Sequence, residues 1–428
     1  MTPRLVIPAK AGTRFNTWCE ALKTAFESFE RILELDFGLR RNDTGARLKP
    51  PSSPTTAHSI VNSRTCVPED PAGRFLFSAS VVPMTDSSLR LPAEWEPQAA
   101  VLIAWPHAGT DWADRLQAVE STYAALAAAV TRFQWLIIVV ADAALHEHVV
   151  AILKATSADL ARIRFVELPY DDTWLRDSGP ITLRGENNRF LLTDFRFTGW
   201  GGKFGAEQDD ALIAGLVDAG VFGAAAHRRI DWALEGGGIE SDGHGTLLTT
   251  WKCLTQRHPE QSRDEMSAIL RDGLHAERVL WLDYGYLEGD DTDAHIDTLA
   301  RFAPGDRIVY QACDDARDTH HAELRQMGDE LAALRTVDGK PYTLYPLPWA
   351  EPIIDEGRRL AASYANYLIV NGAVLVPAYG DPSDDEAARI IGEAHPGRAV
   401  VQVPCRPLIW QNGSLHCITM QLPEGLLG

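Results

Sequence analysis

Four short polar segments, each containing glycine, follow apolar stretches of the chain, where strands are expected to end. They are residues 173–180 (TWLRDSGP), 234–238 (LEGGG), 289–297 (GDDTDAHID) and 412–419 (NGSLHCIT). They contribute a thiol, an imidazole and three carboxylates, which belong to Cys417, His295, Asp177, Glu235 and Asp297. Because catalytic residues concentrate in loops held by a rigid scaffold, these five side chains form the candidate site.

These side-chain types favour covalent chemistry on a cationic substrate. A Cys thiolate is a strong nucleophile, and a neighbouring imidazolium or cationic substrate can provide the lowered pKa that it needs. His295 can act as general acid and base near neutral pH. Several carboxylates around one centre repel one another unless a cation lies between them. A guanidinium is such a cation, because it pairs with a carboxylate through two parallel hydrogen bonds.

Each residue also has a simpler interpretation when taken alone. Asp177 could cap a turn before Ser-Gly-Pro, and Glu235 could lie in a surface loop. The acidic run from Asp290 could suggest a calcium loop, but His295 stands where such a loop needs glycine and Arg301 where it needs glutamate. His295 and Asp297, two positions apart, are expected on one face of a strand.

The other cysteines and histidines are interpreted as structural. Cys417 taken alone would more often be a small buried apolar residue than a nucleophile. Cys253, Cys313 and Cys405 lack comparable surroundings and are expected in the core. His320 and His321 are expected on a helix flank without a metal, and we expect no metal site.

Strands and helices alternate from Met84 onward. Ten apolar segments predict strands, at residues 99–105, 135–140, 164–168, 190–197, 246–251, 279–283, 307–311, 342–347, 367–377 and 399–404. Five segments with helical periodicity predict helices, at residues 114–133, 207–219, 258–273, 318–334 and 383–393. The order strand, strand, helix, strand recurs about five times, which indicates a closed array of similar α/β units.

Composition and charge exclude several classes of protein. The 428 residues are 45% hydrophobic and carry a net charge of −19, so the chain folds and is unsuited to nucleic acid or an anionic membrane surface. Six cysteines without a CxxC pair, no apolar run long enough to span a bilayer and no signal peptide predict a cytoplasmic protein.

Residues 1–83 differ from the rest of the chain. They hold 11 Lys and Arg against 8 Asp and Glu, a net of +3, so the remainder carries −22. A short amphipathic helix near Trp18 precedes a Pro/Ser/Thr-rich linker, and Met84 begins a segment typical of a protein start. We expect residues 1–83 to be a dispensable extension of residues 84–428, a catalytic domain; the alternative is a small docking helix.

The combination of motifs resembles the agmatine deiminase and bacterial-type peptidylarginine deiminase family of the guanidino-modifying (pentein) superfamily. The resemblance extends from about Leu91 to Pro423. Besides the four segments above, it rests on residues 92–97 (PAEWEP), 105–107 (WPH), 198–204 (TGWGGKF), 242–243 (DG) and 366–372 (NYLIVNG).

The resemblance implies a five-bladed α/β propeller with pseudo-fivefold symmetry, and a role for each candidate residue. Cys417 matches the nucleophile, His295 the general acid and base, and Glu235 the carboxylate that orients the histidine. Asp177 and Asp297 match the pair that holds the substrate guanidinium. The loop before His416 departs from the family's three glycines, and Met420 stands where many relatives have glutamine.

The implied reaction is hydrolysis of agmatine to N-carbamoylputrescine and ammonia through a covalent cysteine thiouronium, in polyamine (putrescine) synthesis. It needs no cofactor. An acidic chain with tryptophans such as Trp174 suits a dicationic substrate through carboxylate pairing and cation–π contact. A possible homodimer would suit a compact propeller.

Four other functions stay open at this point. They are deimination of arginine or peptidyl-arginine, amidino transfer, metal-dependent hydrolysis at the Asp/His loop, and non-catalytic binding.

Overall fold

A computed structural model of the chain describes residues 89–427. The predicted extension at residues 1–83 and the expected start at Met84 lie outside this range. None of the described helices is both long and apolar enough to cross a membrane.

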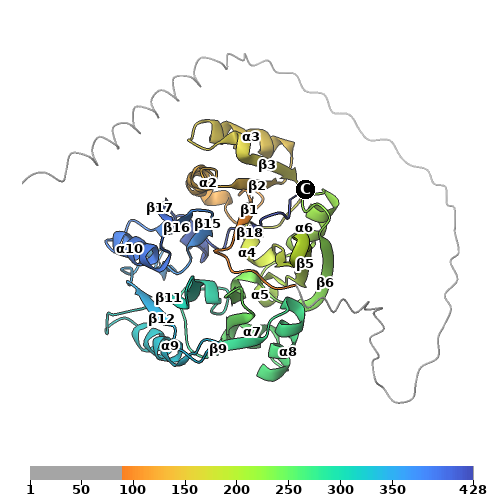
Figure 1. Cartoon of the computed structure of the whole chain (residues 1–428). Coiled ribbons are helices and arrows are strands. Elements are labelled where there is room, and N and C mark those ends of the chain that lie inside the picture. The colour runs from red at the N-terminus through yellow and green to blue at the C-terminus, as the bar shows by residue number, and fades with distance from the viewer. Residues whose placement is uncertain (1–88, 428) are drawn as a thin grey trace, which may run out of the picture. The chain divides into compact units, whose positions relative to one another are not determined.

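Five of the six sheets in the described part of the chain share one strand pattern, and the sixth is a two-stranded hairpin. In each of the five, an antiparallel pair is followed by a parallel strand, reached through at least one helix. Figure 1 shows the five sheets around a common centre, with α2, α3, α6, α8, α9 and α10 at the periphery. This is the predicted mixed α/β repeat of strand, strand, helix and strand.

The first sheet joins the two ends of the described chain. Its strands run in the order β18 (Met420–Pro423), β1 (Gln98–Ala104), β2 (Trp135–Val140) and β3 (Ile163–Glu167). Strand β18 is antiparallel to β1, whereas β1, β2 and β3 are parallel. Their crossovers contain α2 (Leu116–Val130) and α3 (Ala143–Lys154). Strand β2 is a continuous apolar run because its residues after Trp135 are buried on both faces.

The other four sheets have three strands each. They are β4 (Ile181–Arg184), β5 (Phe190–Arg196) and β6 (Ala226–Ala233); β7 (Ile239–Ser241), β8 (Thr246–Thr250) and β9 (Arg278–Leu282); β10 (Ala300–Ala303), β11 (Arg307–Gln311) and β12 (Thr343–Leu347); and β15 (Leu368–Val370), β16 (Ala373–Ala378) and β17 (Ala399–Pro404). Their crossover helices are α6 (Glu207–Asp218), α7 (Trp251–Arg257), α8 (Arg263–Leu274), α9 (His321–Ala333) and α10 (Asp384–Ala394).

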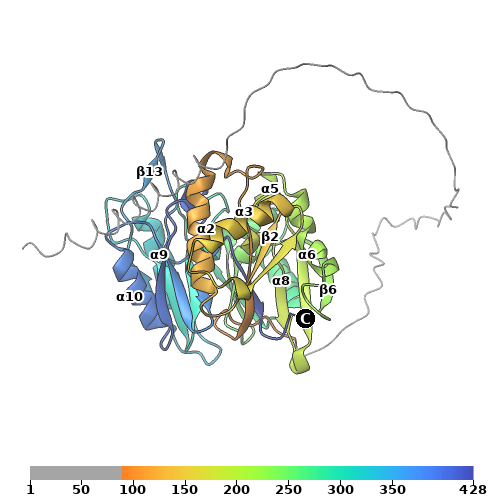
Figure 2. The same ribbon diagram turned by 90° about the horizontal axis from the view of Figure 1, so that it is seen from above.

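Short elements lie between these units. They are α4 (Leu175–Ser178), α5 (Gly199–Gly202), the hairpin β13 (Ile354–Asp355) and β14 (Arg358–Arg359), and the 3₁₀ turns η1 (Ala113–Arg115), η2 (Leu160–Arg162), η3 (Glu186–Asn188), η4 (Gly236–Gly238), η5 (Ile296–Thr298) and η6 (Leu408–Gln411). Figure 2 places α5 and the β13–β14 hairpin at the same end of the molecule.

Three sequence-based predictions differ from the structure. The segment 367–377 is a hairpin, β15–β16, because Gly372 with φ +73° reverses the chain. The helix predicted from residue 258 begins at Arg263, where Ser262 and Glu265 form a capping box. His295 and Asp297 do not share a strand: His295 caps η5 and Asp297 lies within it.

Candidate active site

The five candidate side chains converge, although they come from four separate loops. Asp177 lies on α4, Glu235 follows β6, His295 and Asp297 lie at η5, and Cys417 lies three positions before the start of β18. All five are buried, with at most 5% of their surface exposed. Gly237 marks the centre of the cluster, because a Cβ there would lie 2.7 Å from Asp177 Oδ1 and from His295 Nδ1. The absent side chain therefore lets the carboxylate and the imidazole approach each other.

Asp177 is held by two hydrogen bonds and stripped of water. Trp200 Nε1 donates to Oδ2 at 2.9 Å, and the Gly237 amide donates to Oδ1 at 3.0 Å. Burial raises the pKa of Asp177 to about 6; Asp297 and Glu235 act in the same direction, while His295 opposes them. A bound cation would therefore relieve the repulsion in this cluster.

The two carboxylate oxygens of Asp297 differ in their hydrogen bonding. Its Oδ2 is bonded to His416 Nδ1 at 2.8 Å and to Asn366 Nδ2 at 3.1 Å. Its Oδ1 is buried and has no hydrogen-bond partner among the described residues. Burial favours the neutral form, but the hydrogen bond and charge of His416 outweigh it and lower the pKa of Asp297. The carboxylate is thus ionised and has an unused acceptor.

Cys417 lies between Asn366 and Asp297. Asn366 Nδ2 donates to Cys417 Sγ at 3.1 Å, and the thiol lies 3.5 Å from Asp297 Oδ2. Burial raises the pKa of Cys417 well above its usual value, and Asp297 and Asp177 raise it further. The thiol is therefore neutral before a substrate binds, and a cation placed between the two carboxylates would favour the thiolate.

His295 lies between two carboxylates. Its Nδ1 is 3.5 Å from Asp177 Oδ1, and its Nε2 is 3.6 Å from Glu235 Oε2. Burial acts to lower the pKa of His295, but Asp177 and other neighbours raise it well above the ordinary value. The imidazole is therefore protonated near neutral pH and can donate a proton.

Arg257, on α7, holds Glu235 from the side opposite His295. Arg257 Nε donates to Glu235 Oε1 at 2.8 Å, and Nη1 donates to Asp293 Oδ2 at 2.7 Å. Burial acts to raise the pKa of Glu235, but His295 and Arg257 outweigh it and lower the pKa to about 2. Glu235 is therefore ionised throughout the pH range in which the His295 imidazole would act as an acid or a base.

Replacing Arg257 with glutamine is expected to lower the free energy of unfolding by about 3 kcal/mol, because it removes the hydrogen-bonded one of the two cationic partners of the buried Glu235. Urea titration followed by tryptophan fluorescence measures this change. The control is Arg317→Gln, which removes an exposed partner of Asp315 and should leave the urea midpoint unchanged. A loss below about 1 kcal/mol for the Arg257 variant would contradict the assigned role.

A cavity of about 460 Å³ opens onto Cys417 and Asp177. Trp174, the predicted aromatic contact, lines it together with Trp200 and Trp410. Six aspartates line it: Asp111, Asp171, Asp172, Asp177, Asp209 and Asp291. No Lys or Arg is among the described residues that line this cavity. Burial raises the pKa values of Asp172 and Asp209 to about 7, so near neutral pH these two carboxyl groups are ionised only in part.

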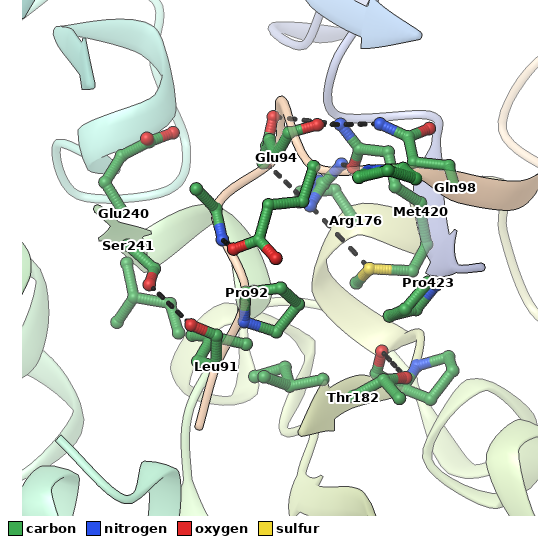
Figure 3. Close-up of a pocket in the computed structure, with 18 residues that line it drawn as sticks. Leu91, Pro92, Glu94, Gln98, Arg176, Thr182, Glu240, Ser241, Met420 and Pro423 are labelled. Atoms are coloured by element: carbon green, nitrogen blue, oxygen red, sulfur yellow. Dashed lines mark hydrogen bonds and ion pairs between the residues drawn. The ribbon is translucent and has the colours of Figure 1, made fainter. Parts of the chain in front are cut away.

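A second, smaller cavity of about 80 Å³ lies behind the cluster. Figure 3 shows Glu94, Arg176 and Met420 pointing toward one another there. Glu94 Oε1 lies 3.2 Å from Arg176 Nη1 and 2.8 Å from His416 Nε2, and Arg301 also pairs with Glu94. Glu94, Arg176 and Arg301 are therefore paired with one another. The contact with Glu94 also fixes the position of His416, which in turn holds Asp297.

Sequence reasoning missed three residues that contact the cluster. In the sequence, Asn366 stands out only as part of the motif at residues 366–372, and His416 only as the neighbour of Cys417. Arg257 gave no signal, since a basic residue at a helix end is ordinary. Cys253 is buried, as predicted, but it also lies beside His295.

Comparisons with known proteins agree on one family. The model for Porphyromonas-type peptidyl-arginine deiminase matches residues 90–423. An agmatine deiminase of Stutzerimonas stutzeri is 34% identical over 358 residues, which are 78% of this chain and 95% of that protein. A putative arginine deiminase from Porphyromonas gingivalis has a similar structure, with a TM-score of 0.73 and 44% identity over 79% of this chain and 99% of that one. A cysteine-to-serine variant of C. jejuni agmatine deiminase with substrate bound reaches a TM-score of 0.73 at 32% identity, covering 79% and 97% of the two chains.

Proposed function

This chain belongs to the Porphyromonas-type peptidyl-arginine deiminase family, and from that membership we propose that it hydrolyses agmatine to N-carbamoylputrescine and ammonia. The observation that carries the choice of substrate is the cavity wall, which holds six aspartates and no basic residue among the described ones. Agmatine is a dication without a carboxylate. Arginine carries a carboxylate, which such a wall would repel. The product is a carbamoylated amine, consistent with a step in polyamine synthesis.

Binding places the guanidinium between Asp177 and the free Oδ1 of Asp297. Its charge offsets the repulsion between these carboxylates and lowers the pKa of Cys417, so the thiolate forms where its target lies. The amine end of the substrate lies toward the other aspartates and Trp174. Holding the guanidinium carbon beside Sγ converts the attack into an intramolecular step.

Two chemical steps follow. Thiolate Cys417 attacks the guanidinium carbon, and protonated His295 gives its proton to the departing nitrogen, which leaves as ammonia. The remaining thiouronium is then attacked by water, whose proton passes to the now neutral His295. Breaking the C–S bond then releases the neutral ureido product, and the remaining hydroxyl proton passes to the departing sulfur, which restores the neutral Cys417 thiol. Glu235, fixed by Arg257, stabilises the imidazolium throughout.

We also propose the finer form of the fold, in which the five sheets are the blades of an α/β propeller. The proposal is supported by the repeated strand order and by the pairing of β18 with β1, which joins the last unit to the first. Such closure would place loops from different units around one axis, where the candidate residues lie.

The activity test is ammonia release from agmatine, arginine and a peptidyl-arginine, with product identified by mass spectrometry. We expect turnover of agmatine and at most weak turnover of the other two. Activity only on arginine or peptidyl-arginine would overturn the substrate assignment and leave the family chemistry intact. Transfer of the amidino group to an added amine, without ammonia release, would indicate amidino transfer instead.

The value of kcat/KM for agmatine should fall as the pH drops below about 6. The reason is that kcat/KM reports the free enzyme, in which the pKa of Asp177 is about 6, and a protonated Asp177 no longer attracts the guanidinium. Initial rates between about pH 4.5 and about pH 8 measure this limb. Asp177→Asn should be weakly active and lack the limb, whereas a wild-type profile that stays flat to about pH 5 would contradict the assignment.

A further inference from the structure

Behind His295, on the side away from the cavity, lies a cluster of three potential metal ligands. Glu235, Cys253 and His295 each offer one ligand atom, and these atoms all lie within 4.8 Å of one another. Cys253 comes from the first turn of α7, so helix, β6 loop and η5 supply one residue each. All three side chains are at most 1% exposed.

The ligand atoms are already close to the spacing of a tetrahedral site. Two ligands at about 2.0–2.1 Å from a zinc ion in such a site are about 3.4 Å apart. His295 Nε2 and Glu235 Oε2 are 3.6 Å apart. An ideal Cβ on Gly238 would lie 3.7 Å from Cys253 Sγ and 3.9 Å from His295 Nε2. The two atoms therefore border the same small space, which this glycine keeps open.

Two of these ligand atoms lack a hydrogen-bond partner among the described residues. They are His295 Nε2 and Glu235 Oε2, both fully buried. Arg257 occupies only the other carboxylate oxygen, Oε1, at 2.8 Å. A second cluster, of Glu94, Glu240 and His416, differs because Arg301 contacts all three of these side chains. His295 Nε2 and Glu235 Oε2 face each other at 3.6 Å, and of the two clusters only the one with Cys253 combines a thiol with a carboxylate oxygen that no arginine among the described residues contacts.

We propose that Glu235, Cys253 and His295 form an inhibitory site for a zinc-type divalent cation. The thiol, imidazole and carboxylate are the ligands that Zn²⁺ takes in proteins, with water in the fourth position. Binding replaces the proton on Nε2 and the thiol proton, and both are released to solvent. The metal is an inhibitor and takes no part in the proposed reaction.

The position of the site predicts the form of inhibition. The metal lies at Nε2, whereas Nδ1 faces Asp177. The cavity that receives the substrate, lined by Asp177 and Cys417, stays open. Since the metal holds Nε2, His295 can no longer become the doubly protonated acid. Zinc should therefore lower kcat and leave KM within about twofold, whereas an ion bound to Cys417 would compete with substrate.

The experiment separates binding from inhibition, because the inhibition arm rests on the proposed function and the binding arm does not. Cobalt chloride serves as a coloured substitute for zinc, and its thiolate complex is read by near-ultraviolet absorption without substrate. We expect the band in the wild-type protein and in Cys417→Ala, and its loss in both Cys253→Ala and Cys253→Ser. Loss of the band in Cys417→Ala, or no band in any protein, would overturn the proposal.

The second arm titrates zinc chloride into the agmatine assay. Each Cys253 variant is measured relative to its own zinc-free rate, and both variants should need at least about 100-fold more zinc for half-inhibition than the wild type. Unchanged zinc sensitivity in both Cys253 variants would overturn the inhibitory role. If the wild type releases no ammonia from any guanidine, the proposed function fails while the cobalt result still decides the site.

Discussion

Replacing Cys417 with serine should reduce kcat for agmatine roughly 10⁴–10⁶-fold, as loss of a catalytic nucleophile does elsewhere. A serine hydroxyl is far less acidic than a thiol, and this site already disfavours an anion, because burial, Asp297 and Asp177 all raise the pKa of Cys417. The guanidinium that rescues a thiolate cannot rescue an alkoxide to the same extent. Ammonia release under saturating agmatine measures the change.

Two further readouts connect this loss to covalent catalysis. Calorimetry should show that the Cys417→Ser protein still binds agmatine, because Asp177, Asp297 and Trp174 are unaltered. Acid quenching followed by mass spectrometry should trap an adduct on the wild type and none on the variant. Cys313→Ser, which changes a buried thiol outside the cavity, is the control and should retain activity. Near-normal turnover by Cys417→Ser would refute the assignment of the nucleophile.

Replacing His295 with alanine should lower kcat about 10²–10⁴-fold, the usual contribution of a general acid and base. The effect arises in both steps. The departing nitrogen must receive a proton to leave as ammonia, and the attacking water must lose one. The value of KM should change less, because the guanidinium is held by the carboxylates. Steady-state kinetics with agmatine separates the two parameters.

Added imidazole tests whether the missing function is proton transfer. We expect partial recovery of kcat in His295→Ala, since the deletion leaves space beside Asp177 for a small base. His321→Ala removes a histidine that bonds the Cys313 carbonyl and serves as the control. If the two histidine variants behaved alike, the loss would reflect packing and His295 would have no catalytic role.

Much of the sheet framework was predictable because its strands are runs of apolar and β-branched residues, and β2 is also buried on both faces after Trp135. The segments 135–140, 307–311 and 399–404 coincide with β2, β11 and β17. Short strands such as β4 and β10, four residues each, leave too little pattern to detect. The error at residues 367–377 has the same origin, since the apolar run continues through the turn at Gly372.

The candidate residues could be found from the sequence because their types are unusual together and each lies in a glycine-bearing loop. The residues that hold them in place could not be found in this way. Arg257 and Glu235 are 22 positions apart, and His416 and Asp297 are 119 apart, so no local spacing connects them. Cys253 was correctly predicted to be buried, yet only its packing against His295 gives it possible chemistry.

The sequence by itself determined the repeating α/β order, the family and the five candidate side chains, because these follow from local pattern and residue type. Only the tertiary structure decided their electrostatics. Burial keeps Cys417 neutral, raises the pKa of Asp177 to about 6 and lets Arg257 and His295 lower that of Glu235 to about 2. Those shifts depend on desolvation and on distances between loops from different sheets, which no stretch of the chain encodes alone.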